Sequence, residues 1–306
     1  MRTIPNETSA TVIAAANDFR RYCLDTVRLL DLTEDGARSI IAFPRLLDEI
    51  NEVINDDPTD ATSADPEREA RMSERRKSAE MAQAEIERGF PLLHSHALMG
   101  IWGALESAVD DACLAHALAN PGVLAEGKLA KVKVNAVDFL ALDEPQRIQL
   151  ILAEGRRISA SSLRVGVAQF EYALEDVGLD GAIDENIRNT LRIAKAMRNV
   201  IAHRAGKIDR RFVEDCPDLE LKHGDALRIS KPQIYSVVMA AIMYLLTIAN
   251  RSRKHAGEEE KPIDIFPIDS RVELVKPFRP GWSPDDWFMS QVTTKDGDES
   301  ATSSAD

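Results

Sequence analysis

Three side chains near one predicted helix end have the types and the spacing needed to act on a phosphate. Residues 192–211 read RIAKAMRNVIAHRAGKIDRR, in which Asn199 and His203 are four positions apart and so share one face of an α-helix. Arg198 lies about 140° of helical rotation from His203, so its long side chain has to bend towards them. Arginine offers paired donors to phosphate oxygens, and histidine can exchange a proton near neutral pH. The three residues are therefore candidates for phosphate binding and proton transfer.

A basic cluster surrounds these candidates. It consists of Arg204, Lys207, Arg210 and Arg211, and within that stretch only Asp209 opposes it. The whole chain is acidic, because its 306 residues contain 51 Asp and Glu against 38 Lys and Arg, a formal net charge of −13. Since such a chain repels nucleic acid overall, any RNA contact requires a local basic patch. We expect these four residues to bind RNA.

The same residues also allow plainer interpretations. An Arg-x(4–6)-His pattern is not specific by itself, since Arg88 and His94 also match it across Gly89 and Pro91, an occurrence that we interpret as accidental. A histidine near a helix end often binds the last carbonyls or the helix dipole, and exposed arginines often only solvate a surface. The pattern alone therefore does not establish a site.

No cofactor or metal is expected. His94 and His96 lie about 200° apart on a helix, on opposite faces, which argues against a zinc set with Cys113 and His116. The sequence contains no Gly-rich phosphate loop and no Ser-centred elbow.

Cysteine use and hydropathy predict a soluble, cytoplasmic protein without membrane contact. Three widely spaced cysteines in a chain of this length indicate reduced thiols. The amino terminus lacks the pattern of a signal peptide. The longest apolar run, Val237 to Ala249, is shorter than the roughly 20 residues that cross a bilayer.

Helical periodicity dominates the chain and predicts an all-α fold, an antiparallel up-and-down helical bundle. Pro44 is expected to kink or split one helix, Asp184 occupies an N-cap position, and Gly206 follows a helix end. The stretch 213–231 alternates weakly and predicts a short hairpin-like connector. The predicted helices cover residues 10–32, 35–55, 68–88, 92–120, 145–156, 161–177, 184–203 and 232–254.

Composition divides the chain into five parts. An N-terminal helical region, 1–56, is followed by a polar linker, 57–67, and by a helical domain, 68–256. An irregular extension, 257–294, is rich in proline and aromatic residues and is expected to pack on the body. The tail, 295–306, is expected to be disordered.

The surroundings of the candidate residues resemble the HEPN superfamily, most of all its RiboL-PSP-type branch. The sequence MRNVIAHRAGKID, at the end of an amphipathic helix and before a connector and a strongly apolar helix, carries the resemblance. LMGIWGALESAVDDA resembles an earlier helix of the family. The resemblance covers roughly 92–254 and is sharpest over 184–254. It implies a helical bundle that dimerises so that two Arg-x(4–6)-His motifs face one cleft, and in many members metal-independent RNA cleavage.

By this resemblance each candidate takes a role. His203 corresponds to the proton-transferring residue, Arg198 to the phosphate clamp and Asn199 to the polar residue that follows the arginine. Glu106, on the earlier helix, corresponds to an acid that orients Arg198. Some members carry a tyrosine two residues after the histidine, which a nucleotidyltransferase modifies; Ala205 stands there in this chain, so that regulation is not expected.

Two functions remain open on the sequence. The first is a metal-independent endoribonuclease in toxin–antitoxin or antiviral defence, with RNA as substrate, a homodimer as the working unit and an antitoxin or other protein as a further partner. The second is a non-catalytic HEPN-like module that binds RNA or another protein. Cleavage of RNA in EDTA distinguishes them.

Overall fold

The computed structural model describes residues 5–54, 66–158 and 166–261. Within these ranges the regular elements are helices, and a single isolated antiparallel bridge joins Lys207 to Ala226. The all-α prediction is therefore confirmed. The longer helices are α1 (Pro5–Ile54), α2 (Pro66–Arg88), α3 (Pro91–Ala119), α5 (Glu144–Ile158), α6 (Val167–Glu175), α7 (Glu185–Arg204) and α9 (Lys231–His255); the short ones are α4 (Ala136–Leu140), α8 (Arg210–Asp215), η1 (Pro121–Ala125), η2 (Leu129–Lys131) and η4 (Pro217–Leu219).

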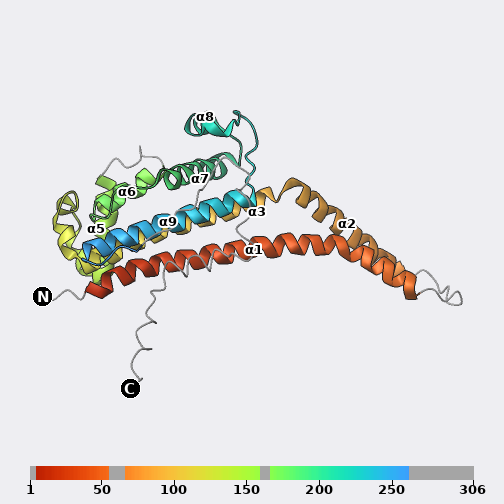
Figure 1. Ribbon diagram of the computed structural model, residues 1–306, viewed down its shortest axis with the longest axis horizontal. Helices are drawn as coiled ribbons and strands as arrows, with labels where there is room; N and C mark the ends of the chain where they lie inside the picture. The colour runs from red at the N-terminus through yellow and green to blue at the C-terminus, as the bar shows by residue number, and fades with distance from the viewer. Residues whose placement is uncertain (1–4, 55–65, 159–165, 262–306) are drawn as a thin grey trace, which may run out of the picture.

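Helix α9 lies at the centre of the bundle, against α1, α3 and α7 (Figure 1). Ser230 begins it with a capping box, in which its hydroxyl and the Gln233 side chain each bind the other residue's backbone N–H. Almost every residue from Ile234 to Ala249 is buried, as expected for a helix that is apolar on all sides. By length and composition α9 could cross a membrane, but 78% of its most apolar stretch is covered by the bundle.

Helix α1 is one continuous helix, so the prediction of separate helices over 10–32 and 35–55 is wrong, and Pro44 does not split the second of them. A proline inside a helix removes one backbone hydrogen bond, and a glycine such as Gly36 costs about 1 kcal/mol against alanine. Packing outweighs both, because α2 runs along this half of α1 and Pro44 is buried.

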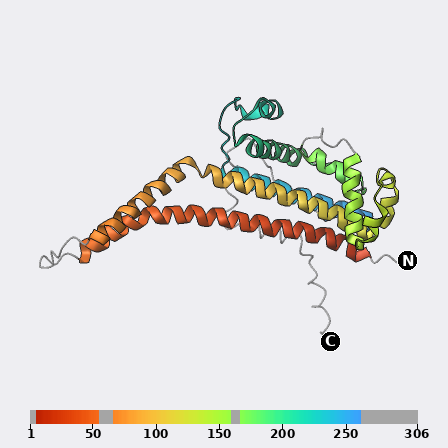
Figure 2. The same cartoon turned by 180° about the vertical axis from the view of Figure 1, so that it is seen from behind.

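The two halves of α1 have different neighbours. The first half packs on α3 and α9, and Lys231 of α9 holds it through Asp31 at 2.5 Å and Glu34 at 3.0 Å. The second half pairs with α2 in a two-helix arm that extends beyond the bundle (Figures 1 and 2). The predicted N-terminal region therefore contributes to the bundle itself.

Helix α7, which carries the candidate residues, is fixed at its start. Asp184 caps it as predicted, since its Oδ1 accepts hydrogen bonds from the N–H groups of Asn186 and Ile187. The loop before it is tied to α9 by Arg251, which donates to the backbone carbonyls of Leu179 at 2.9 Å and Ala182 at 3.0 Å. The orientation of α7 therefore follows from buried polar contacts as well as from its apolar face.

The connector between α7 and α9 differs from the predicted hairpin. Residues 213–231 contain the end of α8 and the turn η4, and the bridge pairs Ala226 with Lys207, which precedes that stretch. A single bridge pair does not form a strand. The regular structure of the connector consists of short helical turns instead. The predicted linker 57–67, except its last two residues, the extension after residue 261 and the tail 295–306 lie outside the described residues.

Candidate functional site

The end of α7 folds back so that α8 covers it. Ala205 adopts a left-handed conformation, φ 49°, followed by Gly206 at φ 81°. The N–H groups of both residues donate to the carbonyl of Val200, which satisfies the helix end. The chain thus reverses directly after His203, and Asp209 starts α8 by accepting a hydrogen bond from the Phe212 N–H at 2.9 Å.

Between α7 and α8 lies a small hollow that contains two of the three candidates. Asn199 is half-buried and His203 exposed, one helical turn apart, and both line a cavity of about 180 Å³ together with Arg211 from α8. The remaining lining residues are Ala196, Val200, Asp209, Phe212 and Asp215.

Arg198 lies beside this hollow and reaches it through Asn199. Its Nη1 donates to Oδ1 of Asn199 at 3.4 Å, a long hydrogen bond. The guanidinium thus bends round the helix in the direction that the sequence required, and it is half-buried rather than enclosed. Arg198 and His203 flank the same amide, so one phosphate group bound at Asn199 would be within reach of both.

Two carboxylates offset part of the basic cluster. Oδ2 of Asp209 lies 3.7 Å from Nε of Arg204, and Oδ2 of Asp215 lies 3.6 Å from Nε of Arg211. Asp215 follows the basic stretch in sequence, and its approach to Arg211 depends on the single turn of α8. Exposed pairs of this kind are weak, so both arginines remain able to exchange a carboxylate for a phosphate.

Arg204, Lys207, Arg210 and Arg211 are all exposed around the end of α7. Of the four, only Arg211 lines the hollow. The others are exposed at the end of α7, on the turn between α7 and α8 and at the start of α8, and do not line the hollow.

Glu106 does not meet Arg198. Its Oε1 accepts the indole N–H of Trp102 at 2.8 Å, and in the described part of the chain it forms no ion pair with that arginine. Its charge acts instead on Lys195, one turn before Asn199 on α7. Burial lowers the pKa of Lys195, and the positive charges of Arg198 and Arg211 lower it further, whereas Glu106 opposes them.

Lys195 is a site neighbour that the sequence analysis missed. Its ammonium donates to Oε1 of Gln169 in α6 and lies 5.7 Å from the centroid of the Trp102 ring, which positions the cation. The spacing in the sequence could have indicated Lys195, because it lies four residues before Asn199 and therefore on the same face of the helix.

No protein-family model matches this chain, and neither the curated proteins nor the solved structures contain a match to it. The features of this chain that bear on function are therefore the arrangement of Arg198, Asn199, His203 and Arg211 at one hollow and the sequence pattern around them.

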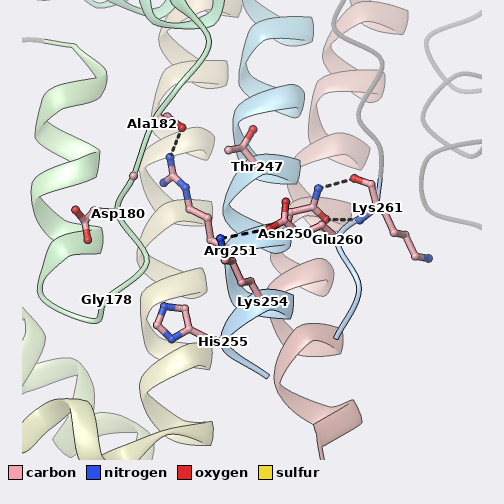
Figure 3. A pocket seen from close by; sticks show the side chains of 11 residues that line it. Gly178, Asp180, Ala182, Thr247, Asn250, Arg251, Lys254, His255, Glu260 and Lys261 are labelled. Atoms are coloured by element: carbon pink, nitrogen blue, oxygen red, sulfur yellow. Dashed lines mark hydrogen bonds and ion pairs between the residues drawn. The ribbon is translucent and has the colours of Figure 1, made fainter. Parts of the chain in front are cut away.

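A larger hollow, of about 830 Å³, lies beside the second half of α9 (Figure 3). Two of its polar side chains, Arg251 and Asn250, are already engaged by the protein. Arg251 donates to the carbonyl of Ala182 at 3.0 Å, and Asn250 exchanges two hydrogen bonds with the backbone of Lys261, at 2.6 and 3.1 Å. These contacts fasten two loops to α9, so we interpret this hollow as a structural joint.

Two histidines of α3, His94 and His116, form contacts within the fold. Nδ1 of His94 lies 2.8 Å from the carbonyl of Ile229, and its Nε2 lies 3.6 Å from Oε1 of Glu34. Nδ1 of His116 lies 3.5 Å from Oγ of Ser252. Among the residues that the structure describes, no group of three or more His, Cys, Asp or Glu side chains is arranged to hold a metal ion. The buried cysteines, none of them in a disulfide, are Cys23, Cys113 and Cys216.

Proposed function

We propose that this chain is a metal-independent endoribonuclease of the HEPN type, in which His203 transfers protons and Arg198 binds the scissile phosphate. The observation that carries the proposal is the open hollow at the end of α7, where His203 and Asn199 face Arg211 and Arg198 touches Asn199. An imidazole, an amide and two guanidiniums around one small space suit a phosphodiester.

The reaction requires no metal or cofactor. A neutral imidazole removes the proton from the ribose 2′-OH, and the 2′-oxygen attacks the adjacent phosphorus. An imidazolium protonates the departing 5′-oxygen as its bond to phosphorus breaks. The products are a 2′,3′-cyclic phosphate and a 5′-hydroxyl, and the arginines stabilise the negative charge that builds on the phosphoryl oxygens.

A second copy of the chain completes this site. One chain places one histidine, His203, at the hollow, whereas the reaction uses a base and an acid at the same time. A volume of about 180 Å³ is smaller than the roughly 300–1,000 Å³ of ordinary ligand pockets, and it suits a phosphate group rather than a whole nucleotide. Two such hollows facing each other across a twofold axis would supply two histidines and a cleft wide enough for a strand.

The exposed basic side chains near the hollow indicate where the rest of the RNA strand binds. Arg204, Lys207 and Arg210 surround the hollow without lining it, so we place neighbouring phosphates of the strand against them. The proposed setting is cytoplasmic toxin–antitoxin or antiviral defence, where an antitoxin or other protein partner would restrain the nuclease.

Substitution at the hollow tests this function. Purified chain is incubated with a panel of single-stranded RNAs in EDTA, and the cleavage rate is read from gels. His203→Ala and Arg198→Ala should each lower the rate by about 10²–10³-fold, because each removes a positioned group from the transition state. The matched controls are His223→Ala, an exposed histidine outside the hollow, and Arg188→Ala, an exposed arginine at the other end of α7; both should cut at the wild-type rate.

The second function, a non-catalytic module that binds RNA or another protein, draws on the two carboxylates in the hollow. The carboxylates of Asp209 and Asp215 reduce the positive potential of the hollow, which lowers its affinity for a phosphate group. Wild-type chain that binds the RNA panel and leaves it intact in EDTA would support the module and contradict the nuclease.

A further inference from the structure

From Leu29 onward, α1 exposes an unusual amount of apolar surface. Six large apolar side chains of this part of the helix are between 43% and 71% exposed, although α2 runs alongside its end. They are Leu29, Leu32, Ile40, Phe43, Leu46 and Ile50. A contiguous exposed apolar surface of this kind marks a site of protein association. We call this set the α1 stripe.

The spacing of the α1 stripe is that of a coiled coil. Leu29, Gly36, Phe43 and Ile50 recur every seven residues, the a positions of a heptad. Leu32, Ser39 and Leu46 occupy the d positions. The stripe runs for about 32 Å along the helix, at 1.5 Å per residue. It therefore spans three heptads, the shortest run that indicates a coiled coil.

We propose that the α1 stripe binds the α1 stripe of a second copy of this chain, antiparallel, around a twofold axis. In an antiparallel coiled coil each a position faces a d position of the partner helix. The register that places Leu29 opposite Leu46 of the second copy also places Leu32 opposite Phe43. Four apolar layers form together, because the twofold axis repeats each pair.

The size of the residues fits this register. Gly36 and Ser39 face each other next to the axis, where small side chains let the helices approach closely. Beside them lies a hollow of about 390 Å³ lined by Ser39, Ile40, Phe43, Pro44, Arg75 and Ser78. Leu32 of the second copy stands opposite Phe43, at the edge of this hollow, and at 71% exposure it is the most exposed of the six side chains of the stripe. The twofold axis thus brings a protruding side chain to a hollow that can receive it.

Charge fits the same register. Arg28 and Glu49 are both exposed and both occupy g positions, which flank the apolar seam. In antiparallel pairs g faces g, and the register above places Arg28 of each copy opposite Glu49 of the other. The apolar layers, the residue sizes and the charges thus favour the same alignment of the two helices. A helix that bound an unrelated protein would not need to be complementary to itself in this way.

This interface is independent of the proposed nuclease cleft. The hollow with His203 lies between α7 and α8, on the opposite side of α9 from α1 (Figures 1 and 2). Pairing through the stripe therefore joins two bundles by their arms and leaves the α7 end free. If both interfaces form, the assembly contains at least four chains.

Molar mass measured by light scattering, without RNA, tests the stripe. One chain has a mass of 33.9 kDa. Leu32→Glu places a charge in an apolar layer and should halve the molar mass of the wild-type assembly. Met81→Glu is the matched control, since Met81 is 74% exposed on α2 outside the stripe, and it should leave the mass unchanged. Circular dichroism verifies that both variants stay helical.

Charge reversal tests the register. Arg28→Glu and Glu49→Arg should each raise the dimer dissociation constant at least several-fold, and the double variant should restore it. A wild-type chain that elutes at 33.9 kDa at tens of micromolar overturns the proposal, as does a double variant weaker than either single one. A Leu32→Glu variant that melts earlier at unchanged mass also overturns it, because the stripe would then be covered from within the chain. Absence of RNA cleavage affects none of these readings.

Discussion

Asn199 is the residue that connects the candidate site. Its amide oxygen accepts from Arg198, and its side chain lines the hollow with His203. The sequence predicted the closeness of Asn199 and His203, because a spacing of four fixes two residues on one helix face. It did not predict the contribution of Arg211 and Asp215 to the hollow, since that depends on how α8 docks, which local spacing does not encode.

The carboxylate of Asp215 gives a prediction at this scale. Asp215→Asn removes the partner of Arg211 and one negative charge from the hollow, so RNA should bind more tightly. An exposed ion pair contributes about 0.2–1 kcal/mol, which corresponds to a fall in the RNA dissociation constant of up to about fivefold at low salt. Fluorescence anisotropy measures it. Glu214→Gln, exposed on the same helix and outside the hollow, is the control. An equal gain in RNA affinity in this variant would show that the net charge of the chain, and not the position of Asp215, causes the effect.

At the scale of elements, periodicity predicted most helices because each buries one apolar face. The predicted ranges 184–203 and 232–254 differ from α7 and α9 by one residue at each end. The prediction was wrong where tertiary packing overrides a local signal. Pro44 would end an isolated helix, but α2 supports α1 on both sides of it.

The loop before α7 provides a prediction about elements. Glu171 is mostly buried and accepts from Arg251, from the Tyr244 hydroxyl at 2.7 Å and from the Gly181 N–H at 2.8 Å. Arg251→Met leaves that carboxylate without its cation, and should lower the free energy of unfolding by about 3–5 kcal/mol.

Urea denaturation measures this loss. Arg188→Met is the matched control, because it breaks only the exposed pair with Glu185, and should cost less than about 0.5 kcal/mol. Equal losses in the two variants would show that the contact between Arg251 and Glu171 does not hold the loop.

At the scale of the whole molecule, an acidic chain places a dense basic cluster at the end of α7 and a row of exposed apolar residues along α1. The sequence indicated the first feature through the charge count around Arg198. It did not indicate the second, because the heptad spacing of α1 is also the spacing of an ordinary core helix. Only the position of α2, which covers one side of α1 and leaves the stripe exposed, distinguishes the two.

Stability of the whole bundle should depend on pH through His116. Burial lowers the pKa of this histidine to about 4, and the nearby His255 adds to the effect. In the unfolded chain a histidine titrates near its ordinary value, so the unfolded state binds the proton first as the pH falls. Stability should therefore fall between about pH 6.5 and 4 and level off below, by about 3 kcal/mol in total.

Urea denaturation across this pH range measures the effect. Carboxylates also titrate there, so the comparison is with His116→Gln, in which this part of the slope should be absent. Equal slopes of unfolding free energy against pH in the two proteins would mean that His116 takes up its proton at the same pH in the folded and the unfolded state.

Cleavage of paired RNA substrates in EDTA tests the central claim most directly. One oligonucleotide is all-ribose, and its partner has the same sequence with 2′-deoxyribose throughout. Attack by the 2′-oxygen requires that the wild-type chain cut only the first, that the product end in a 2′,3′-cyclic phosphate, and that His203→Ala stop the reaction. Equal cutting of both substrates, or full activity in His203→Ala, would contradict it.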